Sequence, residues 1–224
     1  MGADPVKKEE RAGGGRRRGL FITFEGCEGS GKSTQARILG ERLAGGGQRV
    51  VMTREPGGTP GAESIRELTL VGEADRWPPM AELLLMYAAR ADHLEKVIRP
   101  ALAGGETVIS DRFADSSMAY QGWGRKIGVK PIAALDQIVL GATIPDLTVM
   151  LDVPAEVGLR RVSDRGETDR FETMHLEFHK TLRQAYLQIA ANNPQRCVVV
   201  RGDGEPAEIA SKIWRAVQDR LGPI

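Results

Sequence analysis

The chain has 224 residues, of which 41% are hydrophobic and 27% charged, so its length and composition fit one α/β domain with a buried core. The formal net charge of +1 excludes a strong overall attraction to nucleic acid or to an anionic membrane, and no apolar stretch approaches the roughly 18 residues of a membrane span, so we expect a cytoplasmic protein. The two cysteines, Cys27 and Cys197, are too few for a disulfide framework or a cysteine-rich metal site.

Residues 1–18 differ in composition from the rest of the chain. They contain six basic and three acidic residues around three consecutive glycines, and they offer little to bury. This composition is typical of disorder, so we predict a disordered basic leader followed by a single domain over residues 19–224. A nucleic-acid-binding arm is the alternative, but no aromatic residues are interleaved with the basic ones.

In residues 19–224, short apolar segments alternate with longer segments of helical periodicity. This alternation is typical of an α/β fold in which helices cover both faces of a parallel sheet. The predicted strands span 20–25, 49–53, 107–110, 147–151 and 196–201, and the predicted helices 32–43, 62–70, 79–102, 131–140, 156–163, 172–191 and 206–221. Ligands of such sheets bind beyond the carboxyl ends of the strands, so the loops after these strands form the candidate site.

The segment between the first predicted strand and the first predicted helix matches the phosphate-loop pattern G-x-x-x-x-G-K-[ST]. Glycines let backbone N–H groups converge on phosphate oxygens, while Lys32 would neutralise the β- and γ-phosphates and Ser33 would hold Mg²⁺. A glycine-rich turn that matches by chance is the alternative, but the flanking strand and helix favour a nucleoside triphosphate site. The residues predicted to bind it are Gly26, Cys27, Glu28, Gly29, Ser30, Gly31, Lys32 and Ser33.

The loops after the second and third predicted strands carry charged residues. Arg54 precedes a proline and two glycines, which suits a rigid clamp on an anion, and an ordinary surface turn is the alternative. Asp111 ends an apolar strand, as does the acid that helps to hold Mg²⁺ in many nucleotide sites. Arg112 beside it could bind a second phosphate, whereas a simple Asp–Arg salt bridge would have no further role.

Arg90 follows an apolar stretch in the predicted helix 79–102, one turn after Met86. A guanidinium in such a place needs a partner, and it can hydrogen-bond a base carbonyl or ring nitrogen. Spacing favours Glu82 over Asp92 or Glu95 as its protein partner. A purely structural role for Arg90 is the alternative.

Residues 160–171 contain four arginines and balancing acids between two predicted helices. Such a mobile charged segment could close over a transferring phosphoryl group, exclude water and donate an arginine to the developing charge. We therefore predict a lid here. An exposed charged helix end explains the same composition nearly as well when the segment is read alone.

Together these segments resemble bacterial thymidylate kinases, a family of P-loop nucleoside monophosphate kinases, over residues 19–221. The resemblance is carried by the strings FEGCEGSGKST, TREPGGTPGAESIR, MYAARADHLEKVIRPAL, DRFADSSMAYQG and RGETDRFE. It implies the P-loop kinase fold, with a five-stranded parallel sheet and a short lid, and a homodimer. It also implies transfer of the γ-phosphoryl group of ATP to dTMP with Mg²⁺ held by Ser33 and Asp111.

The same resemblance assigns roles to individual residues. The residues that would bind dTMP are Glu28, Arg54, Arg66, Met86, Arg90, Arg112, Ser117, Tyr120 and Gln121. The residues that would act in catalysis are Lys32, Arg54, Arg112 and Arg165. Family members supply a catalytic arginine from the phosphate loop or from the lid, and Gly29 occupies the loop position, so Arg165 of the lid is expected. Met86 stands where an aromatic residue usually stacks on thymine, and Phe113 where a tyrosine is frequent.

Other functions remain open at this point. A kinase for another nucleotide or for a deoxynucleoside would run the same reaction on a different acceptor. A motor would hydrolyse ATP without an acceptor, and a GTP switch would be expected to carry an Asn-Lys-x-Asp motif, which does not occur. A non-catalytic binding protein would bind ATP without transferring phosphate.

Overall fold

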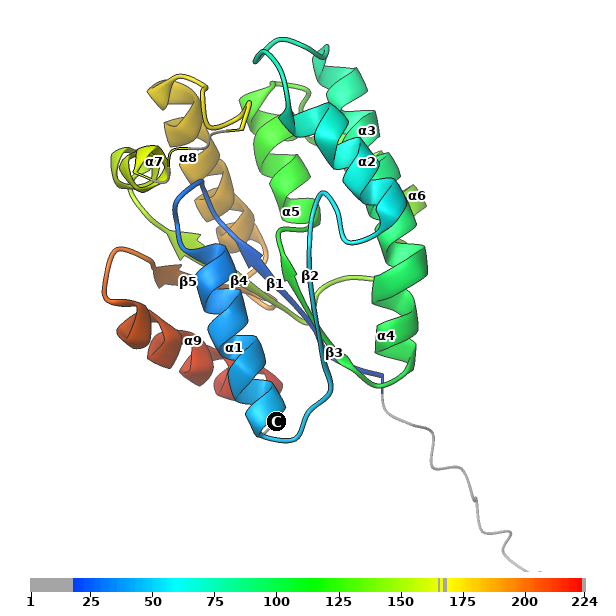
Figure 1. The fold of residues 1–224 in the computed structure, drawn as a ribbon, viewed down its shortest axis with the longest axis vertical. Coiled ribbons are helices and arrows are strands. Elements are labelled where there is room, and N and C mark those ends of the chain that lie inside the picture. Colours follow the sequence, from blue (N-terminus) through cyan, green and yellow to red (C-terminus); the bar gives the residue numbers. More distant parts are fainter. Residues whose placement is uncertain (1–17, 165, 167–168, 223–224) are drawn as a thin grey trace, which may run out of the picture.

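The computed structural model describes residues 18–164, 166 and 169–222. Within them, five parallel strands form one sheet in the order β2-β3-β1-β4-β5 (Figure 1). The strands are β1 (Phe21–Glu25), β2 (Val50–Arg54), β3 (Thr107–Asp111), β4 (Leu147–Asp152) and β5 (Cys197–Arg201). The predicted five-stranded parallel sheet is confirmed, and each predicted strand end lies within one residue of the observed one.

Helices connect the strands and cover the sheet. They are α1 (Lys32–Gly45), α2 (Pro60–Leu70), α3 (Pro79–His93), η1 (Leu94–Ile98), α4 (Arg99–Ala103), α5 (Ala114–Ser117), η2 (Met118–Gly124), α6 (Val129–Val139), α7 (Ala155–Ser163), α8 (Leu176–Asn192) and α9 (Pro206–Leu221). The predicted helix 79–102 is α3, the π-helical turn η1 and α4 in succession. Pro100 has no N–H to donate to the carbonyl four residues earlier, which interrupts the α-helical ladder at this point.

One helical prediction is wrong in its extent, and one helical segment was not predicted. The predicted helix 172–191 begins only at Leu176, because the Asp169 carboxylate accepts hydrogen bonds from the backbone N–H groups of Phe171 (2.8 Å) and Glu172 (3.0 Å) and holds a turn there. The segment after β3 was predicted as a loop and is helical as α5 and η2. It lacks an apolar repeat, so its helicity depends on tertiary packing, in which Ala119 and Tyr120 are buried.

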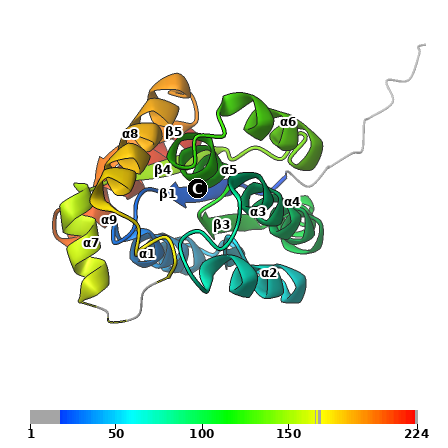
Figure 2. The ribbon, with the colours of Figure 1, turned by 90° about the horizontal axis from the view of Figure 1, so that it is seen from above.

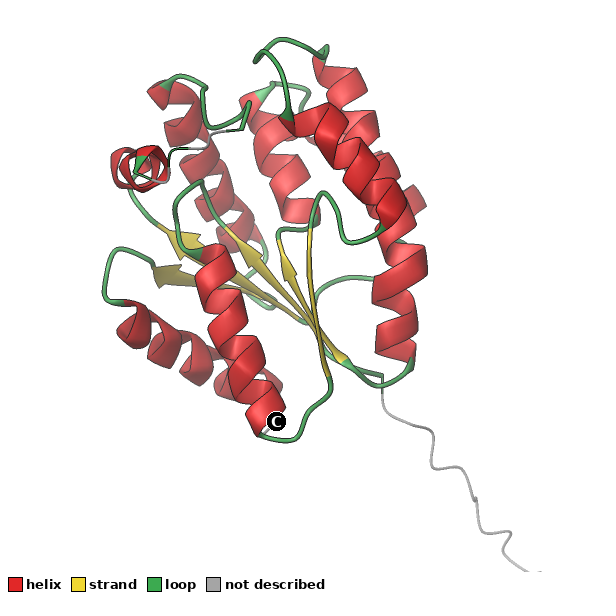
Figure 3. Cartoon of the chain, in the orientation of Figure 1, coloured by secondary structure: helices red, strands yellow, loops and turns green. Residues whose placement is uncertain are grey.

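Two apolar layers enclose the sheet. On one face, α1 and α9 pack against the strands through a core that includes Leu39, Ile213 and Phe24. On the other face, α3, α4, α6, η2 and α8 contribute to two further clusters of buried side chains. Figure 2 shows α1 on one side of the sheet and α5, α6 and α8 on the other, and Figure 3 shows the strands in yellow among the helices in red. The prediction of helices on both faces is confirmed.

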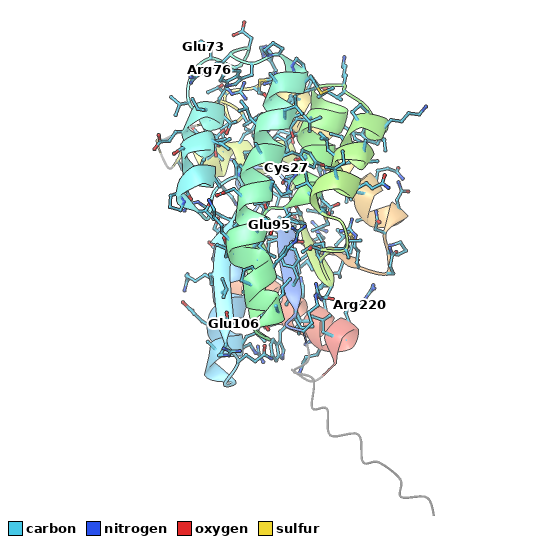
Figure 4. All side chains as sticks on the ribbon, turned by 90° about the vertical axis from the view of Figure 1, so that its right-hand side faces the viewer. Cys27, Glu73, Arg76, Glu95, Glu106 and Arg220 are labelled. Carbon is cyan, nitrogen blue, oxygen red and sulfur yellow. The ribbon has the colours of Figure 1, made fainter. Side chains whose placement is uncertain are left out.

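The connections that follow the strands gather at one end of the molecule (Figure 1). The α2–α3 connection, marked by Glu73 and Arg76 in Figure 4, reaches the same end. Of the predicted leader, residues 1–17 lie outside the described residues, and the Arg18 guanidinium is ion-paired with Asp146 at 2.9 Å. Among the described residues, no helix combines the length and the apolar character that crossing a membrane requires.

Candidate active site

The phosphate loop leaves β1 and enters α1 along a path that requires glycine at several positions. Gly29 has a φ of +65°, and a Cβ placed on it would lie 2.1 Å from the carbonyl oxygen of Gly158 in α7. No larger residue fits there without moving α7 or the loop. Gly31, with a φ of +91°, forms the last turn before α1. The contact with α7 therefore leaves no room for a side chain at position 29.

Lys32 is buried at the start of α1 and turns back over the loop. Its ammonium group donates to the Cys27 carbonyl oxygen at 2.7 Å and lies 3.3 Å from the Ser30 hydroxyl oxygen. Burial, together with the positive charge of Arg112, lowers the pKa of Lys32 below its usual value. A buried cation held by neutral oxygens gains from the arrival of an anion, so this site favours a phosphate group.

The two predicted metal ligands lie in direct contact. The Ser33 hydroxyl, in the first turn of α1, donates a hydrogen bond to the Asp111 carboxylate at the end of β3. A hydroxyl and a carboxylate oxygen at one point form a hard-oxygen donor pair that suits Mg²⁺. Among the described residues, no group of three or more His, Cys, Asp or Glu residues is placed to hold a metal ion. Phosphate oxygens and water would have to complete the coordination.

Arg112 connects the phosphate loop with the region after β3. Its guanidinium donates to the carbonyl oxygen of Gly26 (3.0 Å) and the hydroxyl of Tyr186 (2.9 Å), and it is ion-paired with Glu28 (3.0 Å). Burial opposes its charge, but Tyr120, Tyr186 and Glu28 raise its pKa well above the usual value. Its backbone φ of +71° is rare for a residue with a side chain, and such strain is concentrated at functional sites.

Glu28 is the buried acidic partner of this arginine. Its Oε1 atom accepts hydrogen bonds from Arg112 and from the Tyr120 hydroxyl, and His179 Nδ1 lies 3.4 Å from its Oε2 atom. Burial alone would raise the pKa of Glu28, but Arg112, His179 and Lys32 hold it far below its usual range. Glu28 is therefore a fixed anion that links the phosphate loop to Arg112 and Tyr120.

A cavity of about 520 Å³ lies beyond the carboxyl ends of β1, β2 and β3. Lys32, Ser33 and Asp111 line one part of it. Every residue that was predicted to bind the acceptor also lines this cavity, namely Glu28, Arg54, Arg66, Met86, Arg90, Arg112, Ser117, Tyr120 and Gln121. The structure therefore brings these residues together from five separate stretches of sequence.

Two arginines accompany Arg112 at the cavity. Arg54 is exposed and ion-paired with Glu63 at 3.1 Å, and Arg66 donates to the Pro56 carbonyl oxygen at 2.7 Å. Burial and the positive charges of Arg54 and Arg112 lower the pKa of Arg66. The lowered pKa indicates that like charges repel one another here, and a bound phosphate group would reduce that repulsion.

The predicted pairing of Arg90 with Glu82 is wrong. The Arg90 Nε atom is 2.7 Å from Glu55 Oε2, and the guanidinium also donates to Ser117 and to the Phe113 carbonyl oxygen, each at 3.0 Å. Helical spacing cannot identify Glu55, which follows β2 and lies 35 positions earlier in the chain. Arg90 still lines the cavity, so these contacts within the protein hold its guanidinium group at the site.

The predicted lid is only partly described. Arg165, the predicted catalytic arginine, lies outside the described residues. Arg161, which was not selected, donates to the carbonyl oxygens of Gly29 (3.2 Å) and Gly202 (3.1 Å) and lines the cavity. The cluster of arginines in the sequence indicated this region, but it could not show which member faces the loop. Arg170 is fully buried and ion-paired with Glu82, so it is not an exposed lid residue.

Comparisons with known proteins agree with this geometry. The family model for thymidylate kinase matches residues 24–213. The thymidylate kinase of Caulobacter vibrioides is 56% identical over 204 residues, which cover 91% of this chain and 98% of that protein. The thymidylate kinase of Rhodopseudomonas palustris strain BisB18 is 50% identical over 212 residues, with 93% and 92% covered. A crystal structure of thymidylate kinase from Ehrlichia chaffeensis matches with a TM-score of 0.73 at 35% identity, covering 90% of this chain and 99% of that one.

Proposed function

Because this chain belongs to the thymidylate kinase family, we propose that it transfers the γ-phosphoryl group of ATP directly to dTMP, with Mg²⁺, to give dTDP and ADP. The observation that supports this most strongly is the cavity of about 520 Å³, which a phosphate loop and several arginines line together. Two anionic phosphates must meet in such a reaction, so cations are needed on both sides of the gap. No covalent intermediate is required, because positioning and charge stabilisation carry this chemistry.

On the donor side, the backbone N–H groups of residues 26–33 and the Lys32 ammonium group would bind the ATP phosphates. Lys32 would exchange its contact with the Cys27 carbonyl oxygen for phosphate oxygens, which are better acceptors because they are charged. Ser33 and Asp111 would hold Mg²⁺, which when bound supplies positive charge to the β- and γ-phosphates.

On the acceptor side, Arg54, Arg66 and Arg112 would bind the dTMP phosphate. Their like charges already crowd one part of the cavity, so an anion there removes repulsion as well as forming hydrogen bonds. Tyr120, fixed by its hydrogen bond to Glu28, would lie against the deoxyribose. These contacts set the acceptor phosphate beside the loop that holds the donor.

Thymine would be recognised by residues of α3 and η2. Arg90 keeps N–H donors that its protein contacts do not use up, and these suit a base carbonyl. Ser117 and Gln121 supply further polar atoms, and the thioether of Met86 would pack on the ring.

Arg165 would supply the charge that the transition state needs. The proposal rests on Gly29, because the contact with Gly158 leaves no room for a side chain at the phosphate-loop position. A lid arginine is then required, and such a residue also excludes water when the lid closes.

A coupled ADP-release assay with a panel of acceptors tests the proposal. Turnover with dTMP that exceeds turnover with dUMP, AMP and thymidine is expected. Preference for another member of the panel would replace dTMP as the substrate. ADP release that is the same without any acceptor would instead identify a hydrolase, and ATP binding without transfer to any member would identify a binding protein.

A homodimer remains a prediction from the family. Light scattering coupled to size-exclusion chromatography would give about twice the chain mass of 24.3 kDa if the prediction holds. A mass equal to that of one chain at micromolar concentration would contradict it.

A further inference from the structure

Glu82 is a fully buried carboxylate in α3, one helical turn before Met86. Two guanidinium groups from distant segments are ion-paired with it: Arg170 at 2.6 Å and Arg125, which follows η2, at 3.0 Å. Both arginines also donate to the Ala74 carbonyl oxygen in the α2–α3 connection. These contacts fix the position of the Glu82 carboxylate, because moving a buried charge away from its two oppositely charged partners would leave it uncompensated.

The remaining contact of this carboxylate is with the cavity residue Gln121. The Gln121 Nε2 atom donates to Glu82 Oε1 at 2.8 Å. A carboxylate offers only acceptors, so the amide nitrogen of Gln121 must face Glu82, and the reverse orientation would set two oxygens against each other. The Gln121 side chain lines the cavity. The amide oxygen is therefore the atom that it offers to a ligand.

We propose that Glu82 is a positioning residue that fixes the amide orientation of Gln121 and thereby makes the site select a pyrimidine with an N3–H donor. This inference rests on the proposed function, because it assumes that a pyrimidine monophosphate occupies the cavity. Thymine and uracil carry a hydrogen on N3, which the amide oxygen can accept. Cytosine presents a bare N3 acceptor, so it would face the Gln121 oxygen without a hydrogen between them. Sites built to receive a donor discriminate strongly against analogues that lack it.

The substitution Glu82→Gln removes the cause of this orientation while keeping the shape of the side chain. A glutamine at this position can accept from Gln121 or donate to it, so both amide orientations of Gln121 become accessible. Because Glu82→Gln also leaves the buried Arg170 and the half-buried Arg125 without the carboxylate that pairs with them, the double variant E82Q/R125Q is needed. It restores the net charge of the cluster and protects folding.

The experiment measures kcat/KM for dTMP and for dCMP, together with the equilibrium Kd of each. We expect the ratio of kcat/KM for dTMP to kcat/KM for dCMP to fall by about tenfold or more in both E82Q and E82Q/R125Q. The reason is that a reoriented Gln121 amide would donate to the cytosine N3 atom and would no longer accept from the thymine N3–H group. Arg125→Gln is the matched control. It weakens the same cluster but keeps the carboxylate, so its ratio should stay within about threefold of the wild-type ratio.

A folded E82Q/R125Q enzyme with the wild-type dTMP-to-dCMP ratio would overturn the inference. So would an Arg125→Gln enzyme in which this ratio falls as far as it does in E82Q. Wild-type protein that phosphorylates dTMP without preference over dCMP would also overturn it, while leaving the proposed function intact. Wild-type protein that neither binds nor phosphorylates dTMP would refute the proposed function itself, and that result is read before any variant is compared.

Discussion

Glu25 should make the folded protein less stable as the pH rises from acidic to neutral values. It ends β1 directly before the phosphate loop and is fully buried. Its carboxyl group accepts from the Phe113 N–H at 2.7 Å and from the Ser116 hydroxyl at 2.6 Å. Burial, and then the negative charge of Asp115, raise the pKa of Glu25 to about 7, although the hydrogen bonds and Arg112 oppose the rise.

The sign follows from linkage between proton binding and folding. The folded protein holds the Glu25 proton more tightly than the unfolded chain does, for which the usual pKa is 4.5. The stabilisation is therefore complete below pH 4.5 and is lost as the pH rises through about 7. At about 1.4 kcal/mol per pKa unit, the loss is about 3 kcal/mol, most of it between about pH 5 and about pH 8.

Urea unfolding of the wild type and of Glu25→Gln across this pH range measures the effect. The variant cannot titrate, so the difference in unfolding free energy between the two proteins should change by about 2–3 kcal/mol between pH 5 and pH 8. Glu41→Gln, which removes an exposed carboxylate paired with Arg37, is the control and should follow the wild type within about 0.5 kcal/mol. A constant difference between wild type and Glu25→Gln at all pH values would refute the reasoning.

Three further predictions concern the site. Arg165→Ala should lower kcat by ~10³–10⁵ and leave dTMP affinity nearly unchanged in steady-state kinetics and calorimetry; an equal loss in binding and turnover would count against its catalytic role. Met86→Phe should tighten dTMP binding by up to about tenfold, since ring stacking adds about 0.5–1.5 kcal/mol, and unchanged or weaker binding in calorimetry would contradict this. Gly29→Ala should lower the free energy of unfolding in urea by about 1–3 kcal/mol and weaken ATP binding, because its Cβ would meet the Gly158 carbonyl oxygen. Wild-type values in both assays would contradict this, since they would mean that α7 moves aside without cost.

The order of strands and helices could be predicted from the sequence because each strand is a short apolar run between helical segments. The phosphate loop and the closeness of Ser33 to Asp111 could also be predicted, since a motif and a strand end place these residues at one edge of a parallel sheet. Such patterns involve residues that are close together in the sequence, so they can be recognised without knowing the fold.

Features that depend on distant partners could not be predicted in this way. The ion pair of Arg90 with Glu55 joins two segments that no helical spacing connects. The same holds for Arg170, which the sequence places in a charged surface segment and the fold buries against Glu82. The helical turns of α5 and η2 were missed because packing, rather than an apolar repeat, stabilises them.

The central position of β1 and β3 has a consequence for how specificity can evolve. Both strands are paired on each side, whereas β2 lies at an edge of the sheet. Asp111 ends β3, and the loop that leads from β1 reaches Lys32 and Ser33 at the start of α1, so the residues proposed to bind the donor follow two inner strands. Arg54, proposed to bind the acceptor, ends the edge strand β2. If these proposed roles hold, a change of acceptor in a related kinase is expected to alter residues at the sheet edge, such as Arg54, before it alters Lys32, Ser33 or Asp111.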